Sequence, residues 1–145
     1  MSESSTKPAP KWFYFVVFLA LVWNILGVAA YVMQVTMTPE ALAALPEAER
    51  ALYENVPSWA TSAFALAVNG GAFGCFLLLL KKNFSIWLLE ISLAGVLVQM
   101  FHSFFIANSY EVYGPGGLSM PIMVLIVSIY LVYLSRSAKA NGWTS

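Results

Sequence analysis

Residues 84–106, FSIWLLEISLAGVLVQMFHSFFI, form an apolar run that is long enough to cross a bilayer, and they decide how the rest of the chain is interpreted. About 20 helical residues, rising 1.5 Å each, cross the ~30 Å hydrocarbon layer. The run also holds Glu90, Gln99 and His102, the only histidine in the sequence. Because polar and ionisable groups are costly inside a membrane, we expect any specific function to depend on this stretch first.

The composition places the chain among membrane proteins. Of its 145 residues, 60% are hydrophobic and 10% are charged, whereas an average soluble domain has roughly 25% charged residues. A net charge of zero without a basic run predicts no nucleic-acid partner. The single Cys75 and the single histidine cannot build a four-ligand zinc site. We find no nucleophile, metal or cofactor motif, and therefore expect a protein that is not an enzyme and carries neither cofactor nor metal.

Three more apolar runs predict an all-α membrane protein, with residues 1–145 forming a single domain of four transmembrane helices. The first run is much longer than the roughly 7–15-residue core of a signal peptide, so we expect it to be retained. The residues before it are polar and contain proline, which predicts a disordered tail over 1–10. The predicted spans are 12–37, 58–80, 84–106 and 118–135, and the predicted outer loops are 38–57 and 107–117.

The connections and the basic residues predict the topology. Lys81, Lys82 and Asn83 leave room only for a very short turn, so the second and third spans should be antiparallel neighbours in an antiparallel bundle. Six of the seven basic residues fall on one side of the four-span arrangement, and Arg50 falls on the other. This bias predicts that both termini are cytoplasmic. The six are Lys7, Lys11, Lys81, Lys82, Arg136 and Lys139.

The first outer loop is acidic and is predicted to contain a short surface helix. Thr38 is suited to cap the helix, Pro39 to occupy its first turn, and Glu40 to interact with its N-terminal dipole. Leu45, Pro46 and Glu47 can restart a second helical turn. The four acids of this loop suit a cationic partner, but such a charge run is usually a solvated loop, and we favour that interpretation.

Small residues along 58–80 predict that the second span is the central packing surface. Ala60, Ala63, Ala67, Gly70, Gly71 and Gly74 form a stripe that lets neighbouring helices approach closely. The pattern Gly70-x-x-x-Gly74 is compatible with packing inside the monomer and with a homo-oligomer. On the third span, helical spacing places Ser92, Gly95, Gln99 and His102 on one face.

Six polar residues inside the spans are candidates for a solute pathway or ligand-binding site. Asn24 and Asn69 fall about halfway across, where they can meet, and Glu90 lies roughly 9 Å from the cytoplasmic end. Each amide also serves as a helix-to-helix hydrogen-bond group worth ~0.6 kcal/mol. Glu90 either carries a proton or binds a cationic group, or else it extends to the cytoplasmic surface or pairs with Lys81 or Lys82. The set is Asn24, Gln34, Asn69, Glu90, Gln99 and His102.

His102 lies at the outer end of its span together with Gln99. A histidine there either relays protons, because its pKa is near neutral, or hydrogen-bonds a neighbouring helix. Glu90 and His102 are twelve residues apart, or ~18 Å along one helix, so they cannot share a metal.

Two long strings resemble a known group of proteins. Residues 21–65, LVWNILGVAAYVMQVTMTPEALAALPEAERALYENVPSWATSAFA, and residues 109–123, SYEVYGPGGLSMPIM, resemble small bacterial four-helix membrane proteins, some of which are labelled sugar transporters. The resemblance implies a bacterial inner-membrane location and solute handling, and it gives no binding residues to carry over. A more remote similarity to DoxX-like proteins implies a subunit of a membrane redox complex.

These observations leave three classes of function. A transporter or transporter subunit would bind a small polar solute such as a sugar, and four helices suggest a dimer or larger assembly. An accessory or assembly subunit would use the small-residue face and the acidic loop to contact another membrane protein. A membrane enzyme would need a catalytic site that the sequence does not offer. The lipid bilayer is a partner in each case.

Overall fold

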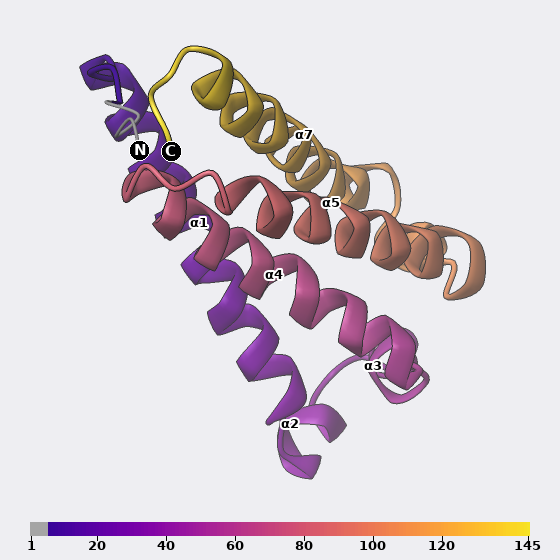
Figure 1. The fold of residues 1–145 in the computed structure, drawn as a ribbon. Coiled ribbons are helices and arrows are strands. Elements are labelled where there is room, and N and C mark those ends of the chain that lie inside the picture. The colour runs from indigo at the N-terminus through magenta and orange to yellow at the C-terminus, as the bar shows by residue number, and fades with distance from the viewer. Residues whose placement is uncertain (1–5) are drawn as a thin grey trace.

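The computed structural model describes residues 6–145, which form a bundle of helices joined by turns (Figure 1). Four of its helical segments are long and apolar enough to cross a membrane, which confirms the predicted all-α class and the predicted count of spans. The third segment is an α-helix continued by one turn of π-helix. The segments are α1 (Lys11–Val35), α4 (Ser58–Leu79), α5 (Ser85–Phe101) with η1 (His102–Ile106), and α7 (Ser119–Ala140).

Four short helices occupy the two loops at one end of the bundle. The first loop contains α2 (Pro39–Ala43) and α3 (Glu47–Glu54), and the second contains α6 (Ser109–Tyr113) and the 3₁₀ turn η2 (Pro115–Leu118). As the sequence predicts, the Thr38 hydroxyl accepts a hydrogen bond from the Ala41 N–H of α2, at 3.1 Å. The Tyr113 hydroxyl donates to Glu49 at 3.4 Å and joins the two loops.

Helix α4 is the central packing element, as its small residues predict. It contacts α1 on one side and α5 on the other, and α7 packs against α5 (Figure 1). At Gly95, α5 lies against the backbone of α4, where a Cβ atom would lie 2.7 Å from the Ala63 carbonyl oxygen and 2.9 Å from the Ala67 nitrogen. Ser92 adds a hydrogen bond to the Ala67 carbonyl, at 2.5 Å. The small residues of α4 therefore serve packing within the monomer.

The C-terminal segment contacts both the α4–α5 turn and the segment that precedes α1. Backbone hydrogen bonds join Lys7 N–H to the Gly142 carbonyl at 2.7 Å, and Asn83 N–H to the Ser145 carbonyl at 2.9 Å. Trp143 packs on Phe13 of α1, with ring centroids 5.4 Å apart. Residues 6–10 thus have a defined place, unlike the disordered tail predicted for 1–10, and residues 1–5 lie outside the described part.

The densest core lies at this same end of the bundle. Side chains from all four long helices are buried there. Toward the opposite end of the bundle the helices spread apart (Figure 1). The four long helices are thus packed together at the end of the bundle where α1 begins and α7 ends. The core residues are Phe13, Val17, Cys75, Leu78, Leu89, Leu131, Leu134 and Ala138.

The fourth span ends later than predicted, and the third span changes its helical form before it ends. Helix α7 continues through Arg136 and Lys139 to Ala140, whereas the prediction ended it at 135. The prediction followed the end of the apolar run, but long basic side chains extend to the interface without ending a helix. The third span changes to π-helix at His102, where the Ala107 N–H bonds the His102 carbonyl at 2.8 Å.

Candidate functional site

All four long helices line one groove of about 460 Å³. Val127 of α7 both lines the groove and packs against the core cluster, so the groove begins where the tightly packed end of the bundle stops. Its walls also include the η1 turn and the start of α7. A groove of this size between membrane helices can accommodate a small ligand.

The surface of the groove is mostly apolar. Three aromatic rings contribute to it, Trp23 of α1, Phe64 of α4 and Phe104 of η1. The polar groups that reach it are few. They are Asn24, Ser92, Gln99, Ser103 and Ser128.

Asn24 is held by contacts within the bundle. Its side-chain nitrogen donates to the Ala20 carbonyl at 2.8 Å and approaches the Cys75 sulfur at 3.7 Å. Its side-chain oxygen lies so close to Gly71 that a Cβ atom there would come within 2.0 Å. Asn24 therefore fixes the contact between α1 and α4 and contributes only part of its surface to the groove.

Two of the serines also have partners. Ser92 donates to Ala67, and Ser128 donates to the Val124 carbonyl of its own helix at 2.8 Å. Gln99 and Ser103 differ, because within residues 6–145 neither the Gln99 amide nor the Ser103 hydroxyl forms a side-chain hydrogen bond. An amide offers two donors and an acceptor oxygen, so Gln99 is the group most available to a ligand in this groove.

The six candidate residues do not form one site. Asn24 and Gln99 line the groove, and Gln34 is half-buried near the end of α1 outside it. The expected contact between Asn24 and Asn69 is not formed, because the Asn69 amide donates to the Ala65 carbonyl of its own helix at 2.8 Å. A backbone carbonyl one turn earlier is always within reach of an asparagine on a helix. A partner on another helix is within reach only if both helices are rotated so that the two side chains face each other.

His102 faces α4. Its side chain is 6% exposed, and its ring meets the Trp59 ring edge to face, with centroids 5.4 Å apart. It lies outside the groove lining. The ring thus packs against a neighbouring helix through an aromatic contact, where the sequence predicted a hydrogen bond or a proton relay.

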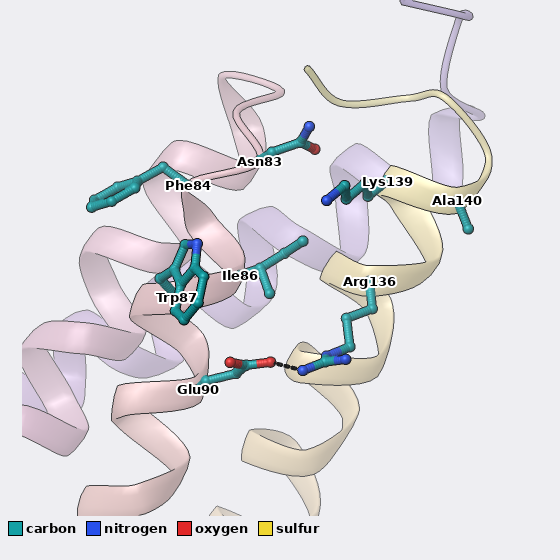
Figure 2. Close-up of a pocket in the computed structure, with 8 residues that line it drawn as sticks. All are labelled: Asn83, Phe84, Ile86, Trp87, Glu90, Arg136, Lys139 and Ala140. Atoms are coloured by element: carbon teal, nitrogen blue, oxygen red, sulfur yellow. Dashed lines mark hydrogen bonds and ion pairs between the residues drawn. The ribbon is translucent and has the colours of Figure 1, made fainter.

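Glu90 lies in a second pocket on another face of the bundle. This pocket, of about 700 Å³, lies between the start of α5 and the end of α7 (Figure 2). The Glu90 carboxylate accepts a hydrogen bond from the Arg136 guanidinium, forming an ion pair. The sequence suggested Lys81 or Lys82 as the partner, and the structure corrects this. Lys81 and Lys82 were favoured because they are only nine and eight residues from Glu90 in sequence. The packing of α7 on α5 instead brings Arg136 to the level of Glu90.

The predicted polar face of α5 is divided between two neighbours. Gly95 meets α4, as does His102 at the start of η1, while Gln99 faces the groove. The groove face follows the steps Ser92, Val96, Gln99 and Ser103. Sequence reasoning missed Val96 and Ser103, although their spacing of three and four residues was the signal for them.

In the part of the chain that the structure describes, no group of three or more His, Cys, Asp or Glu side chains is arranged to hold a metal ion. Comparisons with known protein families, with curated proteins and with solved structures give no match.

Proposed function

We propose that this protein binds a small solute within the membrane, in the groove between its four spans, as a transporter or a subunit of one. The observation that carries the proposal is that every span contributes to one groove of about 460 Å³, which exposes the free amide of Gln99. Membrane transporters place substrates between helices near the middle of the bilayer. The resemblance to proteins labelled sugar transporters supports the same class.

The lining favours a solute that is largely apolar and has few polar groups. Trp23 and Phe104 offer flat apolar surfaces, and Gln99 offers the hydrogen bonds. A free sugar would leave most of its hydroxyl groups without partners, and an unpaired buried hydroxyl costs roughly 1–3 kcal/mol. A sugar with an attached apolar ring agrees both with the resemblance to proteins labelled sugar transporters and with the mostly apolar lining of the groove.

The proposal includes the topology that the sequence predicts. An antiparallel arrangement with both termini cytoplasmic, in a bacterial inner membrane, agrees with the bias of six basic residues toward one side. The hydrogen bonds of Lys7 and Asn83 with the C-terminal segment support it, since they bring the basic segments to one end. A green fluorescent protein fused to the C-terminus should fluoresce in cells, and a dark but translocated fusion would contradict this orientation.

An accessory subunit of a larger membrane complex is the second candidate. It is favoured by one observation, that Asn24, Ser92 and Ser128 already have hydrogen-bond partners within the bundle. Ser92 joins α5 to α4 in this way, and Asn24 approaches Cys75 of α4, so polar groups of the groove already connect helices without any ligand. In that case the groove would admit a helix of another protein and not a solute.

A binding experiment with two probes tests the proposal. We expect the purified protein in proteoliposomes to bind and take up radiolabelled phenyl glucoside in preference to glucose. Gln99→Leu should weaken binding about three- to tenfold, the loss of one or two hydrogen bonds. Asn69→Leu is the matched control, because Asn69 bonds its own helix outside the groove, and it should leave binding unchanged. Equal effects of the two substitutions, or no binding of either probe, would favour the accessory function.

A further inference from the structure

We propose that the pocket between α5 and α7 binds the phosphate group of an anionic phospholipid. This pocket shares no lining residue with the groove, so the inference does not depend on the proposed function. It is lined by two basic side chains, one acidic side chain and two exposed aromatic rings (Figure 2).

The charges in the pocket favour an anion. Arg136 and Lys139 are three residues apart on α7, about 4.5 Å along the helix axis, and both line the pocket. Glu90 neutralises one of these two charges, which leaves one positive charge in excess. A guanidinium has five N–H donors, so a single ion pair with Glu90 leaves donors for a phosphate oxygen. Glu90 therefore positions the Arg136 guanidinium and leaves some of its N–H donors free for a phosphate oxygen.

The position of the pocket favours a lipid over a soluble anion. Phe84 and Trp87 flank it at the start of the third span, and their side chains are 61% and 64% exposed. Aromatic rings at a span end lie at the level of the lipid headgroups. In Figure 2 the rings lie on the α5 side of the pocket and the basic groups on the α7 side. A phospholipid can place its phosphate on the cations and its glycerol and upper acyl chains on the rings, whereas free phosphate uses only the cations.

The volume is also sufficient. A pocket of about 700 Å³ falls within the roughly 300–1,000 Å³ range of small-molecule sites. Basic pockets between membrane helices are typical binding sites for anionic headgroups.

The test is native mass spectrometry of the full-length protein in detergent, with phosphatidylglycerol, phosphatidylcholine or inorganic phosphate added separately. We expect phosphatidylglycerol to be retained in preference to the other two. Lys139→Gln should weaken its retention about fivefold, the effect of one basic residue near a lipid surface. The double variant Glu90→Gln with Arg136→Gln should also weaken it, although the net charge of the pocket is unchanged. Lys82→Gln is the matched control, because Lys82 is exposed near the pocket but does not line it.

Three results would overturn the proposal. Equal retention of the two phospholipids would show that headgroup charge is not recognised, and equal binding of inorganic phosphate would exclude the lipid assignment. An effect of Lys82→Gln as large as that of Lys139→Gln would indicate a general positive surface and not a site. All four substituted side chains are at least partly exposed, and circular dichroism verifies that the variants fold.

Discussion

Gly95 is the residue at which the packing of the bundle can be tested most sharply. Its missing side chain allows α5 to lie against the backbone of α4, where a Cβ atom would be 2.7 Å from the Ala63 carbonyl oxygen and 2.9 Å from the Ala67 nitrogen. Ordinary contacts begin near 3.4 Å. Gly95→Ala therefore forces the two helices ~0.7 Å apart, because backbone atoms cannot rotate away as a side chain can.

The expected loss of stability follows from opposing effects. Overpacking against backbone costs about 3 kcal/mol, at the upper end of the usual range, and alanine recovers about 1 kcal/mol through its higher helix propensity. The net loss is about 2 kcal/mol. Gly27→Ala is the control, because its Cβ would meet only the Val68 side chain, at 3.0 Å, which can shift. Its change should stay within about 1 kcal/mol.

Equilibrium unfolding in mixed micelles of sodium dodecyl sulfate and dodecyl maltoside, followed by circular dichroism, measures both variants. We expect Gly95→Ala to unfold at a clearly lower dodecyl sulfate fraction than the wild type and Gly27→Ala. A Gly95→Ala protein as stable as Gly27→Ala would refute the close packing of α4 and α5.

Two further predictions concern the ends of the bundle. Trp143→Ala should lower the free energy of unfolding by about 2 kcal/mol, because the Trp143 ring covers the fully buried Phe13. Tyr133→Ala is the control: the Tyr133 side chain is 66% exposed, so its loss should change this free energy by less than about 0.5 kcal/mol. Burial, and then the negative charge of Glu49, raises the pKa of Tyr113 above its usual 10.0. The unfolded chain therefore loses this proton at a lower pH than the folded protein, and the free energy of unfolding should fall as the pH rises above 10.0. An alkaline absorbance titration should show Tyr113 deprotonating at a lower pH in Glu49→Gln, and an unchanged titration would contradict the contact.

The four spans and the central position of α4 were predictable because they depend on local patterns. The length of each apolar run predicts a membrane span without knowledge of its neighbours. Small residues at helical spacing predict that α4 is central, since only they allow close approach on two sides. The Thr38 cap was predictable for the same reason, as its partner Ala41 is three residues away.

The candidate sites were predicted less well because they depend on how the helices are rotated and staggered. Depth along each span suggested that Asn24 and Asn69 meet, but each amide bonds a carbonyl of its own helix. Glu90 and its partner Arg136 are 46 residues apart in sequence, and only the packing of α7 on α5 brings them together. Gln99 lines the groove, but its neighbours there are Val96 and Ser103, each one position along the third span from the Gly95 and His102 of the predicted face.

The accessibility of the groove to water is the most direct test of the proposal that it admits a solute. In a Cys75→Ala background, Val124→Cys places a thiol in the groove, and Ile126→Cys, two residues along α7, places one on its exposed outer face. In proteoliposomes we predict that a membrane-impermeant, charged methanethiosulfonate modifies Val124→Cys at least about tenfold faster than Ile126→Cys. The thiol of Ile126→Cys would face lipid, where it does not ionise to the reactive thiolate. Equal protection of both thiols would show that the groove is closed to water and would contradict a solute-binding function.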